Sequence, residues 1–310
     1  RARRLEIGQA IVSVPLVHKV PDVERPWAFK VFGWTIYEED EDPKKHFTIR
    51  EIGALEPTEF TKRVKARLDA PKSGGKRAIL FVHGYNTSFD AGLYRSAQIS
   101  YDLKFGGATF MYSWPSGGGV MSYTYDRESA EQAEIYLRTF IETTIADTGA
   151  QNLSIIAHSM GNQPLLRVLR ELPRGPRARI HIDQVIMAAP DVDRDTFENI
   201  ASQLKGLGRG MTLYVSSKDR AMEASYRFWG YRRAGDVPDQ GPVIVDGLDT
   251  IDVTNTSMEV FALNHSGYAS SPALLTDVGR LIETGMRPPE ARLKELKRVT
   301  IPKGTYWRYP

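Results

Sequence analysis

The residues best placed to do chemistry surround Ser159. An apolar segment at residues 153–157 runs into a short turn, residues 158–161, and an apolar segment with helical spacing follows at once. A serine hydroxyl is a weak nucleophile at neutral pH, so it must stand clear of the backbone and beside a base. A sharp strand-to-helix turn presents it in this way when small residues flank it, as Ala157 and Gly161 do here. The pattern indicates a nucleophilic serine. The alternative is a tight turn in which Ser159 only caps the helix.

A second strand-like segment, residues 78–82, ends in His83-Gly84-Tyr85-Asn86. Strand-His-Gly upstream of the serine turn, in this order and spacing, resembles the α/β-hydrolase superfamily. The two motifs resemble in particular an esterase/lipase-like branch catalogued as a domain of unknown function. The resemblance covers the middle of the chain and departs from the usual motif at residue 157, where alanine stands in the place that most often holds glycine.

The resemblance implies several roles. Ser159 would sit on a nucleophile elbow, and the backbone N–H groups of Tyr85 and Met160 would form the oxyanion hole. Gly84 would let the backbone approach the substrate. His83 is expected to be a buried structural histidine that hydrogen-bonds to its own loop.

The superfamily order along the chain is nucleophile, acid, histidine, which places the remaining members of a catalytic triad after Ser159. Of the six histidines, His265 lies in a polar loop after the last extended segment and is the expected base, whereas His181 begins a strand and lies at the wrong sheet edge. Asp219, in the loop after residues 211–215, is the expected acid. Asp191, one strand earlier, is the alternative acid, and its neighbour Asp193 is a third candidate.

The substrate pocket is expected near the ends of the same strands. Aromatic and small residues there could line an acyl or alcohol pocket, although ordinary core packing explains any one of them equally well. The candidates are Gly84, Trp114, His158, Tyr226 and Trp229.

Strand-like and helical segments alternate along the chain. The spacing predicts an α/β protein with a mainly parallel central sheet and helices on both faces. A single domain, residues 1–310, is the simplest account, with strands within residues 8–37 opening the sheet. The C-terminal extension, residues 288–310, is expected to form a basic helix and then an extended tail whose aromatics pack on the domain. The expected strands are residues 77–83, 108–114, 152–157, 182–188, 211–215 and 244–253.

Composition excludes several classes of site. The chain has 310 residues, no cysteine and a net charge of +3, so thiolate metal sites and disulfides are excluded. No histidine or carboxylate cluster has metal-site spacing, the basic clusters lack a nucleic-acid motif, and no apolar run is long enough to cross a membrane. We therefore expect no cofactor, no metal and no nucleic-acid partner. The compartment and the oligomeric state are left open, and a leader or lipid anchor could precede Arg1.

The resemblance and the serine turn together predict a serine esterase acting on a small-molecule carboxylic ester through an acyl-enzyme. Two alternatives stay open. The same triad would serve an acyltransferase, and a non-catalytic binding protein could retain the fold.

Overall fold

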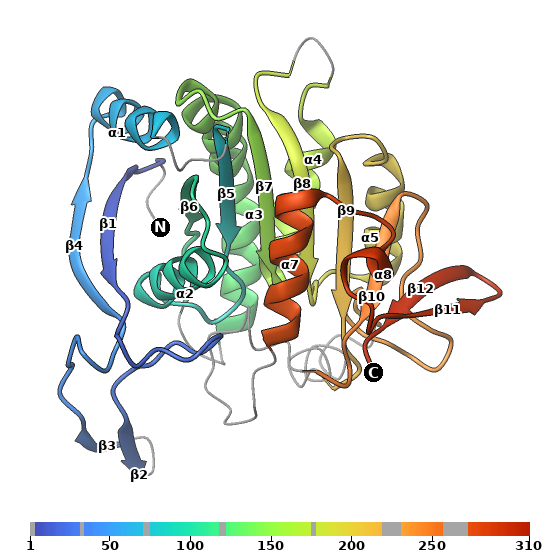
Figure 1. Cartoon of the computed structure of the whole chain (residues 1–310), viewed down its shortest axis with the longest axis horizontal. Helices are drawn as coiled ribbons and strands as arrows, with labels where there is room; N and C mark the ends of the chain where they lie inside the picture. Colours follow the sequence, from blue (N-terminus) through green and yellow to red (C-terminus); the bar gives the residue numbers. More distant parts are fainter. Residues whose placement is uncertain are drawn as a thin grey trace.

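A mainly parallel sheet crosses the molecule in the computed structural model, which describes residues 4–31, 34–70, 75–117, 122–174, 178–218, 231–256 and 272–310 (Figure 1). Its strand order is β11-β12-β10-β9-β8-β7-β5-β6. Every neighbouring pair is parallel except β11 with β12. The sheet predicted from the alternating segments is therefore present. Its strands are β5 (Arg77–Val82), β6 (Ala108–Tyr112), β7 (Asn152–His158), β8 (His181–Ala188), β9 (Gly210–Val215), β10 (Leu248–Asp252), β11 (Lys297–Ile301) and β12 (Gly304–Arg308).

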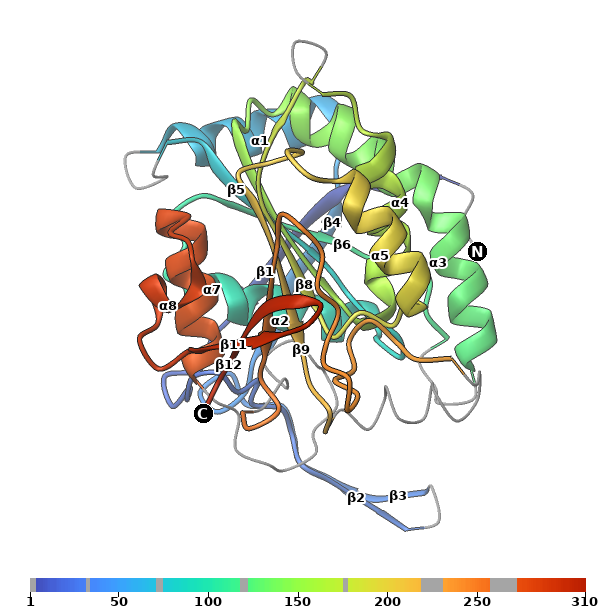
Figure 2. The same ribbon diagram turned by 90° about the vertical axis from the view of Figure 1, so that its right-hand side faces the viewer.

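Helices cover both faces of this sheet (Figure 2). Successive side chains of a strand point to opposite faces, so each buried strand needs cover on two sides. In β5, Leu80 and Val82 belong to one buried cluster, and Ile79 and Phe81 belong to the other. The first face is covered by α1 (Pro57–Asp69), α3 (Tyr123–Thr139), α4 (Asn162–Glu171) and α5 (Arg194–Gln203), and the second by α2 (Phe89–Asp102), α7 (Pro272–Thr284) and α8 (Pro289–Arg292).

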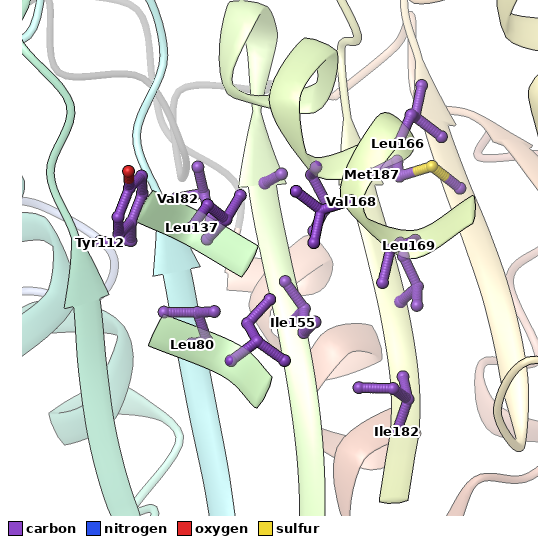
Figure 3. Close-up of a cluster of buried hydrophobic side chains, with 14 of the residues drawn as sticks. Leu80, Val82, Tyr112, Leu137, Ile155, Leu166, Val168, Leu169, Ile182 and Met187 are labelled. Carbon is purple, nitrogen blue, oxygen red and sulfur yellow. The ribbon is translucent and has the colours of Figure 1, made fainter. Parts of the chain in front are cut away.

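The larger cluster fixes α3 and α4 against the sheet (Figure 3). Leu137 of α3 and Leu169 of α4 are fully buried, as are Leu80 and Ile155 on the strands beneath them. Burying one such side chain contributes roughly 1.5–3 kcal/mol. Because α4 begins directly after the serine turn, this packing also holds the turn in place.

The N-terminal strands form two separate two-stranded sheets, so the prediction that residues 8–37 open the main sheet is wrong for the described strands. β1 (Gly8–Ser13) pairs antiparallel with β4 (Thr48–Ala54), and β2 (Ala28–Val31) pairs antiparallel with β3 (Trp34–Glu38). None of the residues of β1 is buried, whereas a strand inside the sheet is buried on both faces. The antiparallel partner β4, which takes up the hydrogen bonds of β1, was absent from the predicted elements.

The C-terminal extension also differs from the prediction. Its helix, α8, is only four residues long, and the tail is a β-hairpin that extends the sheet through β12. Trp307 on β12 is buried in the second cluster, and Tyr306 is 3% exposed, so the aromatic packing expected of this tail is confirmed. Pairing of β12 with β11 and with the end of β10 satisfies the backbone hydrogen-bonding groups of the tail.

The parallel strands place their carboxyl ends along one edge, which is the lower edge in Figure 1. The loops after β5, β6, β7, β8, β9 and β10 all leave from that edge. Ligands of open α/β sheets bind there. Within the described residues, no helix has the length and apolar character needed to cross a membrane.

Candidate active site

Ser159 stands at the carboxyl end of β7, where the strand turns into α4. Strand β7 ends at His158, a single 3-10 turn spans Ser159–Gly161, and α4 begins at Asn162. The φ angle of Ser159 is +50°, in the left-handed region that non-glycine residues seldom adopt. Such strain persists only where the surroundings impose it, and it is concentrated at functional sites. The serine is 6% exposed.

Two glycines allow the loop after β5 to lie close to the serine turn. A methyl group on Gly161 would lie 2.4 Å from the carbonyl oxygen of His83, so only glycine fits between α4 and the end of β5. A methyl group on Gly84 would lie 2.9 Å from Cβ of Ser159 and 2.9 Å from Nδ1 of His158. The loop after β5 therefore runs directly against the serine turn.

That close approach brings both expected oxyanion residues beside Ser159. Tyr85 follows Gly84 in the loop, and Met160 follows the serine and is fully buried. The ring of Tyr85 is half-buried, with its centroid 5.3 Å from that of Tyr123. Burial raises the pKa of Tyr85, and the nearby carboxylates of Asp126 and Asp191 raise it further. The phenol is therefore neutral at physiological pH.

His83 is a buried structural histidine, as expected. It is 0% exposed, and its Nδ1 lies 2.9 Å from the carbonyl oxygen of Gly84. Its Nε2 accepts the backbone N–H of Trp114 at 3.1 Å, while the indole ring stacks on the imidazole at 4.9 Å. Burial lowers the pKa of His83 to about 4. A neutral ring with its proton on Nδ1 fits both hydrogen bonds, and it ties the loop after β5 to the loop after β6.

His158 precedes the serine and is half-buried. Burial lowers its pKa to about 3, and the positive charge of Arg95 on α2 acts in the same direction. The ring is neutral over the physiological range. It lies against Gly84 at the serine turn, and its role in a substrate pocket stays a prediction.

Asp191 lies close to Ser159 but is tied to other groups. Its backbone N–H donates to the carbonyl oxygen of Ser159 at 3.2 Å. Its carboxylate, 2% exposed, pairs with Nε of Arg233 at 3.1 Å and accepts the hydroxyl of Tyr123 at 2.5 Å. Both carboxylate oxygens thus have a strong partner. These contacts fix the Asp191 carboxylate beside the serine turn.

Asp126 is a further buried carboxylate at this edge that the sequence analysis missed. It is 0% exposed and accepts backbone N–H groups from Asn86 at 3.1 Å and Gly117 at 2.6 Å, and the hydroxyl of Ser116 at 2.6 Å. A signal was present in the sequence. Asp126 stands in helical register with Ala130, Ala133 and Leu137, so a charged residue occupies the buried face of α3.

Four predicted site residues lie outside the described residues: His265, Asp219, Tyr226 and Trp229. The described strands that precede them, β9 and β10, end at the sheet edge that carries Ser159. Asp219 comes four residues after the end of β9, and His265 falls between β10 and α7. Since β9 lies next to β8 and β10 lies next to β9, both loops start at the edge that carries Ser159.

A cavity of about 1610 Å³ lies between the two-stranded β1–β4 sheet and strand β6. It reaches the catalytic edge at Thr87, Trp114 and Ser116 and continues along β6 to Gly107. Of the predicted pocket residues, Trp114 borders this cavity, although its side chain is 1% exposed. Among the residues that the structure describes, no group of three or more carboxylates and imidazoles could hold a metal ion.

A mainly parallel sheet with helices on both faces, and a strained serine between strand and helix at its carboxyl edge, define an α/β hydrolase. The family model for "alpha/beta hydrolase of unknown function (DUF900)" matches residues 56–284, and the chain belongs to this family. This agrees with the resemblance seen in the sequence motifs. No curated protein matches the chain.

Solved structures with some likeness to the chain are also hydrolases by description. One is described as a cell surface hydrolase from Lactobacillus plantarum WCFS1, with 10% identity and a TM-score of 0.42, covering 73% of this chain and 97% of that chain. Another is the siderophore hydrolase EstB from Aspergillus fumigatus, with 15% identity and a TM-score of 0.28, covering 68% and 78%. Likenesses this weak carry no argument about substrate or mechanism.

Proposed function

We propose that this hydrolase is a serine esterase that cleaves carboxylic esters through an acyl-enzyme on Ser159. The single observation that carries the proposal is the geometry of Ser159. The residue has a φ of +50° and lies in a tight turn at the carboxyl end of β7, against Gly84 of the neighbouring loop. A serine that only caps a helix needs neither the strained backbone nor the close approach of a second loop.

In the proposed reaction, His265 takes the hydroxyl proton as Ser159 attacks the ester carbonyl. The backbone N–H groups of Tyr85 and Met160 stabilise the oxyanion that forms, helped by the positive end of α4. The alcohol leaves with the proton from His265. Water then attacks the acyl-enzyme, and the same histidine accepts its proton and returns it to Ser159.

Asp219 is the proposed acid, because it would hold the imidazole of His265 in one tautomer and stabilise its cation. Asp191 is the alternative acid, because its backbone N–H donates to the carbonyl oxygen of Ser159. Its engagement by Arg233 and Tyr123 favours Asp219.

The test is a panel of p-nitrophenyl esters of increasing acyl length, run with the native chain and with Ser159→Ala. The variant should lose activity by about 10⁴–10⁶-fold in kcat, as removal of other catalytic serines does. Ser154→Ala is the matched control, since Ser154 is also a buried serine of β7 but lies five residues before the turn. It should keep its activity.

A fluorophosphonate probe distinguishes an esterase from a binding protein that retains the fold. The native chain should be labelled once, at Ser159, and Ser159→Ala should not be labelled. Ester hydrolysis that survives in Ser159→Ala would overturn the proposal, as would a native chain that neither hydrolyses esters nor reacts with the probe.

A further inference from the structure

The buried carboxylate of Asp126 ties together the two loops that border Ser159. It belongs to the first turn of α3, and its three described hydrogen bonds all go to other segments. Oδ2 accepts the N–H of Asn86 in the loop after β5, and Oδ1 accepts the N–H of Gly117 in the loop after β6. The hydroxyl of Ser116 donates to Oδ2.

Ser116 links Asp126 to a second residue of the loop after β5, Thr87. The hydroxyl oxygen of Ser116 accepts the backbone N–H of Thr87 at 3.2 Å. The N–H groups of Asn86 and Thr87, the two residues that follow Tyr85, are therefore both held by Asp126, one directly and one through a hydroxyl. A carboxylate that accepts three donors is well suited to this task because it has lone pairs for all of them and no proton of its own.

The peptide that Asp126 holds is a strained one. Asn86 has a φ of +53°, again in the left-handed region. Gly84, two residues earlier in the same loop, lies against Cβ of Ser159, so a shift of this loop changes the distance between its backbone and the serine. Loop conformations of this kind persist only when surrounding contacts hold them.

Gly117, whose N–H donates to Oδ1 of Asp126, is tightly packed as well. A methyl group on Gly117 would lie 2.5 Å from both Cβ and Oγ of Ser122, at the start of α3. The loop after β6 is thus packed down onto the helix that carries Asp126. Both loops are anchored to one rigid element.

We infer that Asp126 is a positioning residue for the oxyanion hole, fixing the peptide that follows Tyr85 so that the Tyr85 N–H faces the reacting carbonyl. The inference rests on the proposed function of Ser159. Asp126 does not touch the substrate in this role. It acts by holding the backbone of residues 85–87 where charge develops, and electrostatic stabilisation of that kind depends on donors being placed before the reaction starts.

Asp126→Asn tests this with almost no change in shape. A carboxamide keeps one acceptor oxygen and replaces the other with an NH₂ donor. The hydroxyl of Ser116 can turn and accept from that donor, but a backbone N–H cannot. Either Asn86 or Gly117 must then face a donor and lose its hydrogen bond, whichever way the amide is turned. We expect kcat for a p-nitrophenyl ester to fall by about 10- to 100-fold, below the loss caused by deleting an oxyanion donor outright, with KM changed by less than about 3-fold.

Asp183→Asn is the matched control. Asp183 is also a buried aspartate, but it pairs with Arg209 at 3.1 Å and lies in β8 near the opposite edge of the sheet. It should lose stability and keep kcat. Ser116→Ala is the second variant, since it removes the bridge to Thr87 and leaves Asn86 bound to Asp126. It should lower kcat by about 3- to 10-fold, and it keeps the inference testable if Asp126→Asn does not fold.

The readout is the rate and the final extent of fluorophosphonate labelling, measured beside kcat, KM and the thermal midpoint. A positioning role predicts that Asp126→Asn is labelled to the same final extent as the native chain but more slowly, because each folded site is less reactive. A purely structural role predicts fewer labelled sites that each react at the native rate, and that result would overturn the inference while leaving Ser159 as the nucleophile. Native-like kcat and labelling rates in Asp126→Asn, or in Ser116→Ala if the first variant does not fold, would overturn it too. A native chain that is not labelled at Ser159 would overturn both proposals together.

Discussion

Gly84 and Ser159 lie so close that a Cβ on the glycine would sit 2.9 Å from Cβ of the serine. They belong to loops that follow β5 and β7, which are neighbouring parallel strands. A contact shorter than the van der Waals distance cannot be relieved by a side-chain rotation here, because Cβ of each residue moves only with its backbone. The spacing between the expected oxyanion loop and the nucleophile thus depends on the absence of a single methyl group.

Gly84→Ala should therefore reduce kcat/KM by about 10- to 1000-fold, since a displacement of about 1 Å near reacting groups is enough to cost 100-fold. Steady-state hydrolysis of a p-nitrophenyl ester measures this. Gly53→Ala is the control, because nothing lies within 4 Å of the added methyl group there. Equal rates for Gly84→Ala and the native chain would show that this contact does not set the geometry of the site.

The identity of the acid can be decided by comparing Asp219→Asn with Asp191→Asn. We expect Asp219→Asn to lower kcat by about 10⁴-fold, as loss of the acid does in other triads. Asp191→Asn should act mainly on stability, because it disturbs the pair with Arg233. Thermal midpoints and kcat for both variants separate the two effects. If Asp191→Asn loses more activity per folded molecule, Asp191 is the acid.

The pH dependence of hydrolysis should show one acidic limb between about pH 6 and 7, where a base histidine becomes protonated. His83 and His158 do not produce this limb, because burial lowers their pKa values to about 4 and about 3. Both rings remain neutral as the activity falls. A profile of kcat/KM from pH 5 to 9 measures the limb, and activity that stays constant down to pH 5 would exclude a histidine base of ordinary pKa.

His18 should make the free energy of unfolding fall as the pH rises above 6.5. Its side chain is 5% exposed, with Nδ1 2.9 Å from Glu24 and Nε2 2.7 Å from Asp102 of α2. Burial alone would lower its pKa, but the hydrogen bonds and charges of the two carboxylates outweigh burial and raise it above the ordinary value of 6.5. The folded state therefore binds this proton more tightly than the unfolded state. The stabilisation is complete below pH 6.5 and is lost as pH rises through the raised pKa.

Urea unfolding of the native chain and of His18→Gln at several pH values between 6 and 9 tests this. The difference in free energy of unfolding between the two should be largest at pH 6 and shrink as the pH rises. His181→Gln is the control, since His181 is exposed at the start of β8. A difference that stays constant over this range would mean that folding does not raise the pKa of His18.

The central part of the fold could be predicted from the sequence because its signals are local. The buried strands around β5 and β7 are short apolar runs bounded by glycine or polar residues, and the helices between them have clear periodicity. The serine turn was recognisable for the same reason, since Ala157, Ser159 and Gly161 lie within five positions. The structural role of His83 followed from its place at the end of a buried strand.

The two chain ends and the polar clusters were decided only by tertiary structure. Pairing of β1 with β4, and of β12 with β10, depends on which strand edges meet in space, and a one-dimensional pattern contains no record of that. The partners of Asp126 and Asp191 could not be predicted from the sequence, because folding brings Asn86, Gly117 and Arg233 to them from distant positions in the chain. The sequence by itself determined the parallel sheet and the place of the serine, because strand and helix patterns arise from neighbouring residues. The shape of the loop after β5 was decided by contacts between residues 29 to 40 positions apart, since its strained backbone exists only where a buried carboxylate holds it.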